Sequence, residues 1–292
     1  MLSEPASLAI QLLNGLQYAM VLFLLSVGLS VVFGLMNFIN LAHGTLYMLS
    51  AFIGLSVVRV SGSFWSALAL APLVAAVIGS IFYAALLRRL QGEGAMKQVL
   101  VTFGLIFIGI DVVRMIWGDY EEASAPPQLL AESVRIWGHL YPSYRLFVIA
   151  LGLVVALALW LGLERTRLGA VVRAGVDDRV MAASLGINID AAFFGVFCLG
   201  CWLAGLAGVA VSPVLQIYPG MDVAILIPTL VVVVVGGPGS LKGALLGSLL
   251  IGMAETFGAV LLPDFANFMI YAVMVLVLLL RPGGLLPARP AA

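Results

Sequence analysis

One carboxylate lies inside an apolar segment of the sequence. Glu255 falls within the run from Leu241 to Leu262. A carboxylate near the centre of a bilayer is costly, and it usually faces a bundle interior or a water-filled cavity. Glu255 is therefore a candidate to line or gate a transport path. The alternative is a hydrogen-bonded packing residue between helices, and the sequence leaves both interpretations open.

A second polar group lies in MNFINLAHG, residues 36–44, between two long apolar runs. Polar backbone at membrane depth is tolerated only where protein or a water-filled cavity covers it. Asn37 and Asn40 either cap the following helix or face a transport path. His43 is either a hydrogen-bonded structural residue or a proton relay. No chain of Asp, Glu and His accompanies it, which favours the structural role.

A glycine-rich turn, GGPGS, separates two further apolar segments. Gly236, Gly237 and Gly239 follow a short, strongly β-branched run. A Gly/Pro interruption after a short hydrophobic piece is typical of a broken helix near a transport path. These glycines are therefore path candidates together with the polar groups above. A phosphate-binding loop is the weaker interpretation, because the turn lies between membrane segments.

The sequence contains no enzyme signature. It lacks the HExxH, GxSxG and GxxxxGK[ST] patterns, so we expect no nucleotide bound by the P-loop route. Cys198 and Cys201 are three residues apart with no third or fourth soft ligand nearby, which favours packing over a metal site. We therefore expect that the chain is not an enzyme and binds no cofactor or metal itself.

The longest polar stretch runs from Glu164 to Asp190. It carries four arginines, and apolar residues are interleaved with the charges at helical spacing as far as Leu185. Gly186 is typical of a helix stop. A solvated basic loop would not need this apolar content. The pattern therefore favours a short helical element that docks onto a soluble partner.

The composition identifies the class of protein. Of the 292 residues, 63% are hydrophobic and 10% are charged, whereas soluble domains are about 25% charged. The formal net charge is zero and gives no indication of nucleic-acid binding. The chain is therefore predicted to be an all-α polytopic membrane protein that forms one domain, residues 1–292, in a lipid bilayer.

The hydropathy pattern predicts eight or nine transmembrane helices, with broken or re-entrant segments. A helix needs about 20 apolar residues to cross the hydrocarbon. The candidate segments are 8–34, 45–60, 64–87, 98–117, 144–163, 191–211, 224–235, 241–262 and 265–280. Asp222 is expected in a short outside link before the seventh segment. Ten of the fourteen basic residues then fall on one side, which predicts an outside N-terminus and an inside C-terminus.

Several motifs give the sequence a family resemblance. The stretch RLGAVVRAGVDDRVMAASLGINID closely resembles the cytoplasmic loop of permease subunits of branched-chain amino acid ABC importers. GLSVVFGLMNFINLAHGTLYMLSAF, VTFGLIFI, VVVVVGGPGSLKGALLGSLLIGMAE and RPGGLL are similar to other parts of the same family, in the same order. The INLAHG form is similar to one of the two permease types of such importers.

The resemblance implies partners and a location. It implies a second homologous permease subunit, a pair of ABC ATPase subunits that use the ATP, a periplasmic substrate-binding protein, and the bacterial inner membrane. Matching positions of the coupling loop, 164–190, are Arg173, Ala174, Asp177, Asp178, Ala182, Gly186 and Ile187. The substrate is expected to be a branched-chain amino acid or a related amino acid, urea or amide.

A competing hypothesis is a self-contained channel or secondary transporter for a small polar solute. Such a protein would need an ion- or proton-coupling cluster within the membrane, and the sequence offers only Glu255 and Asp111 for it. An integral membrane enzyme comes third, since no nucleophile–base or metal constellation is present.

Overall fold

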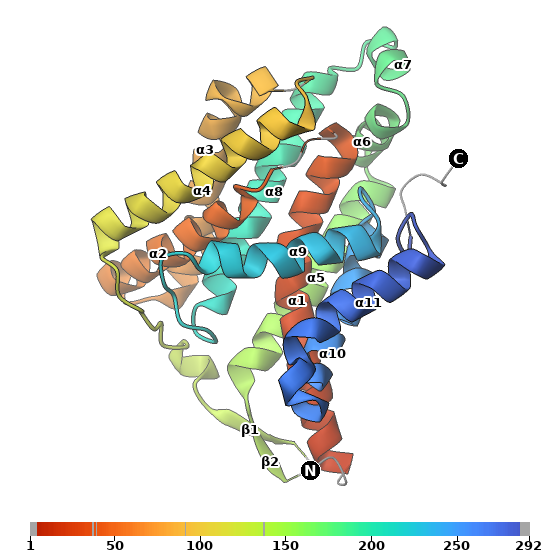
Figure 1. The fold of residues 1–292 in the computed structure, drawn as a ribbon. Coiled ribbons are helices and arrows are strands. Elements are labelled where there is room, and N and C mark those ends of the chain that lie inside the picture. Colours follow the sequence, from red (N-terminus) through yellow and green to blue (C-terminus); the bar gives the residue numbers. More distant parts are fainter. Residues whose placement is uncertain (1–4, 37, 39, 91, 137, 287–292) are drawn as a thin grey trace.

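The computed structural model describes residues 5–36, 38, 40–90, 92–136 and 138–286, which are largely helical (Figure 1). In chain order the α-helices are α1 (Pro5–Met36), α2 (His43–Ser61), α3 (Phe64–Ala85), α4 (Ala95–Trp117), α5 (Ser143–Arg165), α6 (Arg167–Asp177), α7 (Arg179–Ser184), α8 (Ile189–Val211), α9 (Met221–Gly236), α10 (Leu241–Leu261) and α11 (Ala266–Leu280). The short 3-10 helices are η1 (Leu87–Leu90), η2 (Gln128–Leu130) and η3 (Pro263–Phe265).

Seven helices of the described chain are long and apolar enough to cross a membrane, namely α1, α2, α3, α4, α5, α8 and α10. The other two predicted segments, α9 and the last part of α11, are shorter apolar helices. With 16 residues, α9 is about 24 Å long, which is less than the roughly 30 Å of a bilayer core. The prediction of an all-α polytopic membrane protein with a short broken segment is therefore confirmed.

The two polar loops of the sequence lie at opposite ends of the molecule. A small antiparallel hairpin, β1 (Ser133–Ile136) and β2 (His139–Pro142), lies at the end where α1 starts. Helices α6 and α7 lie at the other end (Figure 1). We call these the hairpin end and the coupling end. The sequence did not predict the hairpin, but the separation of the two loops agrees with the predicted topology.

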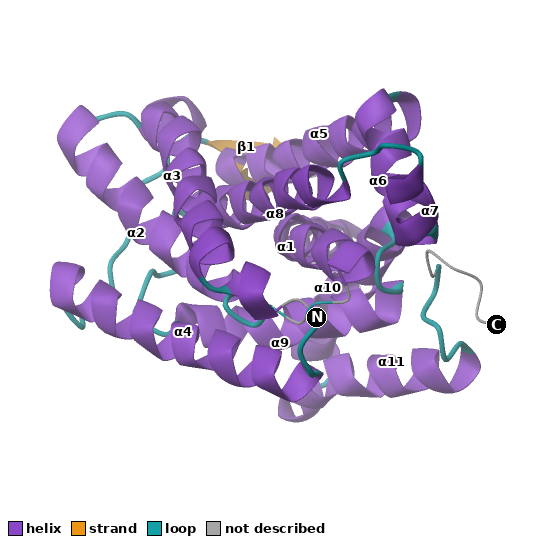
Figure 2. Ribbon diagram, turned by 90° about the horizontal axis from the view of Figure 1, so that it is seen from above, coloured by secondary structure: helices purple, strands orange, loops and turns teal. Residues whose placement is uncertain are grey.

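The central helix of the bundle is α1. In its membrane-spanning window 78% of the residues are buried, against 22% in α5. Seen along the bundle, α1 is enclosed by α5, α8, α9 and α10 (Figure 2). Its sequence has little polar character between Ala19 and Val32, because every face of this stretch meets another helix.

Small residues let the helices approach closely. A Cβ atom at Gly28 of α1 would lie 2.9 Å from the carbonyl oxygen of Gly200 in α8. At Gly208 a Cβ would overlap the carbonyl oxygen of Tyr47 in α2. Glycines of α8 therefore bring it against both α1 and α2, as expected where membrane helices associate by close packing.

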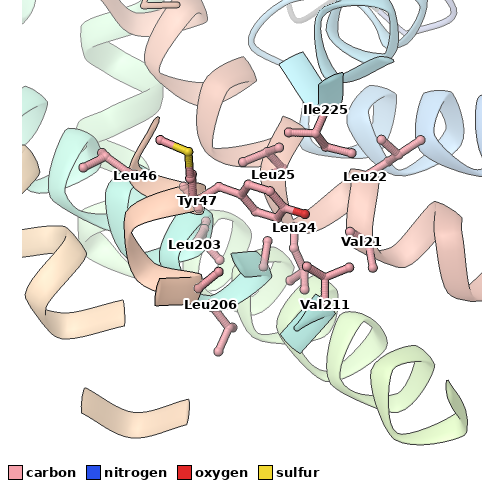
Figure 3. Close-up of a cluster of buried hydrophobic side chains, with 14 of the residues drawn as sticks. Val21, Leu22, Leu24, Leu25, Leu46, Tyr47, Leu203, Leu206, Val211 and Ile225 are labelled. Carbon is pink, nitrogen blue, oxygen red and sulfur yellow. The ribbon is translucent and has the colours of Figure 1, made fainter. Parts of the chain in front are cut away.

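The apolar core is continuous across these contacts. Tyr47 of α2 is 2% exposed and lies among leucines of α1 and α8 and Ile225 of α9 (Figure 3). Cys201 is buried, Cys198 is half-buried, and both are free thiols. The Sγ atom of Cys198 lies 3.0 Å from the Oγ atom of Ser80 in α3, and Cys201 is part of the apolar core.

Candidate functional site

The coupling loop forms two short helices with defined ends. The Thr166 side chain accepts a hydrogen bond from the Gly169 backbone and begins α6. The Oδ1 atom of Asp178 accepts one from the Met181 backbone at 2.9 Å and begins α7. Gly186 follows α7 with a φ of 80°, a conformation that favours glycine. The predicted helical element and its glycine stop are therefore confirmed.

One face of α6 and α7 packs against the rest of the chain. Ala182 is 2% exposed and lies in a cluster with Ile189, Phe193 and Val196 of α8. Val172, Ala174 and Ile187 pack against this cluster, together with Val31 and Met36 of α1. Ala174, Ala182 and Ile187 thus fix the coupling helices to the ends of α1 and α8, which is packing within the chain.

The opposite face is exposed and apolar. Leu168, Val180, Met181 and Leu185 are 60–78% exposed. Arg173 and Asp178 are also exposed, whereas the side chain of Asp177 lies outside what the structure describes. We define Val180, Met181 and Leu185 as the docking face. These three residues were not among the matched positions of the sequence, although the helical spacing of apolar residues gave a signal for them.

The path candidates before α2 have different environments. Asn37 lies outside the described residues. Asn40 is 3% exposed, and its Oδ1 atom has no hydrogen-bond partner among the described residues. The residue that caps α2 is Ala42, with no side-chain cap bond. The capping interpretation of Asn40 is therefore wrong, because the chain turns from Asn40 to His43 through backbone bonds and its amide is left buried.

His43 begins α2 at the crossing of two other helices. Its Nε2 atom lies 3.2 Å from the carbonyl oxygen of Leu25 in α1, with which it forms a hydrogen bond. A Cβ atom added to Gly28 of α1 would lie 3.2 Å from the Cε1 atom of the His43 ring. His43 is 2% exposed. A hydrogen-bonded residue at a helix crossing agrees with the structural role that the sequence favours.

The glycine-rich turn joins α9 to α10 and meets α1. Gly237 and Gly239 have φ values of 99° and 79°. The Gly239 backbone donates to the carbonyl oxygen and to the hydroxyl of Ser30, each at 3.1 Å. A Cβ at Gly236 would overlap the carbonyl of Gly243. The predicted break between two helices is confirmed, and glycine is required there by backbone angle and close approach.

The C-terminal segment holds this turn from its other side. The backbone nitrogen atoms of Leu285 and Leu286 donate to the carbonyl oxygen atoms of Val235 and Gly236, at 2.8 and 3.1 Å. These bonds satisfy carbonyl groups at the end of α9, which a helix leaves without partners. The family-like RPGGLL segment is therefore part of the structure of the glycine-rich turn.

Glu255 is half-buried in α10 and faces α1. The phenol of Tyr18 in α1 lies beside its carboxyl group, while its Oε2 atom is buried without a partner in the described structure. The contact with Tyr18 supports the packing interpretation. The free Oε2 atom keeps the path interpretation open, because a buried acceptor without a partner is unfavourable and is available to a passing polar group.

The path candidates meet α1 at different depths. Glu255 is beside Tyr18, His43 beside Leu25, and the glycine-rich turn beside Ser30. Twelve residues separate Tyr18 from Ser30, or about 18 Å along a helix. The structure therefore brings these groups to one helix as a series and not to one cluster. The role of these groups in a transport path stays a prediction, and no group of potential metal ligands occurs in the described residues.

One buried carboxylate was missed from the sequence. Asp222 was expected in an outside link, but it lies in the first turn of α9 and is 1% exposed. Its Oδ2 atom accepts a hydrogen bond from the Oγ1 atom of Thr45 at 3.0 Å, and its Oδ1 atom lacks a described partner. The prediction was wrong because α9 begins inside the bundle, against the start of α2. The sequence signal for its burial was its position, two residues before the apolar run that begins at Ala224.

The chain is a helix bundle with buried polar groups along its central helix and a helical loop fixed to one end. This is the organisation of a membrane-embedded transport subunit. Comparison with known proteins gives the family. The chain belongs to the family described as "Branched-chain amino acid transport system / permease component", whose model matches residues 11–278.

Individual relatives cover nearly the whole chain. It is 30% identical over 295 residues to the high-affinity branched-chain amino acid transport system permease protein BraD of Pseudomonas aeruginosa, covering 96% of this chain and 95% of that protein. It is 26% identical to LivH of Escherichia coli, with the same coverage of each. Similarity extends to the LivM permease protein of Escherichia coli, at 28% identity over 93% of this chain and 69% of that protein.

Proposed function

We propose that the chain is a permease subunit of an ATP-driven importer for branched-chain amino acids or a related amino acid, urea or amide. Membership of the permease family supports the class of activity, and the names of the relatives support the substrate class. In this proposal a second permease subunit completes the pore, and a substrate-binding protein delivers the solute from the hairpin end. The chain binds no cofactor, and its partners use the ATP.

The observation that carries the proposal is the coupling loop. Its helices α6 and α7 link α5 to α8 and are fixed to α1 and α8 by the cluster around Ala182. Their other side presents the docking face of Val180, Met181 and Leu185 to solvent. An exposed apolar patch on a rigid support is typical of a protein interaction site. A pair of ATPase subunits bound there would move α5 and α8 together as their nucleotide sites close.

The docking face can be tested without disturbing the packed face. We predict that the double variant Met181→Ala and Leu185→Ala retains less than a tenth of the ATPase subunits that co-purify with the chain, because hot spots of an interface are few and apolar anchors dominate them. The matched control is Met115→Ala and Leu100→Ala, which removes exposed side chains of the same two types from α4. Equal recovery of ATPase with both double variants would contradict the proposed coupling surface.

A further inference from the structure

An apolar groove runs along the outside of the bundle. It has a volume of about 940 Å³ and lies between α3, α5, α6 and α8. It is lined by residues of α5 at helical spacing between Leu151 and Leu163, by Thr166 between α5 and α6, and by residues of α8 between Ala191 and Leu206. Apart from the indole nitrogen atoms of two tryptophans, Thr166 is the polar side chain of the lining.

Two glycines make this groove wide. Gly162 of α5 and Gly195 of α8 both line it, and a Cβ atom added to either would meet no atom within 4 Å. Most glycines of the central helices, by contrast, lie against a neighbouring backbone or side chain. The absence of side chains at Gly162 and Gly195 therefore leaves open space along the groove and does not serve close helix packing.

The dimensions and the position of the groove suit a lipid chain. Both α5 and α8 are membrane-crossing helices, so the groove borders the hydrocarbon. Leu151 and Thr166 are fifteen positions apart, or about 22 Å along a helix, and one leaflet contributes roughly half of the 30 Å hydrocarbon core. The groove is therefore longer than the hydrocarbon of one leaflet. An acyl chain extended through the leaflet at the coupling end can lie in the groove over the full length of the acyl chain.

Two arginines flank the inner end of the groove in the sequence. The guanidinium group of Arg165 lies 5.8 Å from the centre of the Trp160 ring. Thr166 lies there between Arg165 and Arg167, and both arginines are exposed. Arginine is well suited to phosphate groups because its guanidinium group presents several donors. Basic residues next to a membrane helix also attract anionic lipids. We propose that the groove binds an acyl chain of an anionic phospholipid, with the lipid phosphate at Arg165 and Arg167.

A lipid in this position would contact the coupling loop. Leu168, Gly169, Val171 and Val172 of α6 form the inner wall of the groove. Val172 also packs against the cluster around Ala182 that holds α7 in place. A lipid in the groove therefore packs against α6 and helps to hold it in place. The lipid composition of the membrane then regulates the coupling loop. This inference is independent of the transported solute.

The acyl site is tested by filling the groove. In native mass spectrometry of the full chain from phosphatidylglycerol nanodiscs, we expect Gly195→Phe to retain at least tenfold less phospholipid than the unmodified chain. The matched control is Gly104→Phe, because Gly104 lies on the exposed side of α4 and a Cβ there also meets no atom within 4 Å. The control should retain phospholipid like the unmodified chain. Equal retention by the two phenylalanine variants would overturn the proposal.

The headgroup contact is tested separately, with a variant that leaves the groove open. Replacing both Arg165 and Arg167 by alanine should reduce the preference for phosphatidylglycerol over phosphatidylcholine at least fivefold, with an acyl chain still bound. An unchanged preference would refute the assignment of the phosphate. Cross-linking of a thiol-reactive photo-cross-linker on Gly195→Cys to the second permease subunit in the assembled complex would show that a protein helix occupies the groove, and would overturn the lipid proposal.

Discussion

Asp178 matches a position of the family's coupling loop, and in the structure its side chain caps a helix. Its carboxylate accepts the Met181 backbone N–H at 2.9 Å and begins α7. An isolated helix of six residues is not stable in water. The cap and the packing of Ala182 therefore decide whether the docking face is ordered.

We predict that Asp178→Ala lowers the stability of α7 by about 1 kcal/mol, the usual effect of losing an N-cap, and reduces ATP-driven uptake several-fold. Asp178→Asn keeps a capping oxygen and should keep most of the uptake. Hydrogen exchange of the α7 amides measures the first effect, and uptake by the assembled transporter measures the second. If the asparagine variant were as impaired as the alanine variant, the negative charge and not the cap would be the important property.

The residues that could be predicted individually are those with a local signature. Gly186 stops α7, and the glycines of the turn at 236–240 end α9, because a positive φ favours glycine. Asn40 and Asp222 could not be placed in this way. Their burial depends on how α2 and α9 meet inside the bundle, and the contact of Thr45 with Asp222 joins positions 177 residues apart.

Helix α8 illustrates the same distinction for whole elements. Its small residues predicted a tightly packed helix, and the structure confirms this. The sequence could not identify the partners, because a glycine allows close approach but does not specify which helix approaches. In the structure Gly200 meets α1, Gly205 meets α3, and Gly208 meets α2. Hydropathy located the nine apolar helices of the described residues within a few residues of their ends. The hairpin of β1 and β2 was not predicted, because its loop has no clear alternation of apolar and polar residues.

The packing of α8 predicts a difference between two glycine substitutions. Gly208→Ala places a Cβ where the carbonyl oxygen of Tyr47 lies, and overpacking of a core typically costs about 1–3 kcal/mol. We expect a clearly lower melting temperature in detergent, measured by intrinsic fluorescence. Gly104→Ala adds the same methyl group in open space and should melt like the unmodified chain. Equal melting temperatures of the two variants would show that α8 and α2 are not in close contact.

At the scale of the whole molecule, α1 connects the two functions proposed for the chain. The polar groups that could line a path meet it at successive depths, and its last turn packs against the coupling helices through Met36. A movement of α6 and α7 therefore reaches the inner end of α1 directly. In the part of the chain that the structure describes, the long helices carry the path candidates and the short helix α7 carries the docking face, and the proposed energy source is a partner.

The most direct test of this account is solute uptake by purified components in liposomes. We predict that the chain, assembled with a second permease subunit and a pair of ATPase subunits, takes up a labelled branched-chain amino acid only when ATP is present on the side of the coupling end and the substrate-binding protein is present on the side of the hairpin end. Uptake of the amino acid by the isolated chain without ATP would contradict the account and would identify the chain as a self-contained channel or secondary transporter.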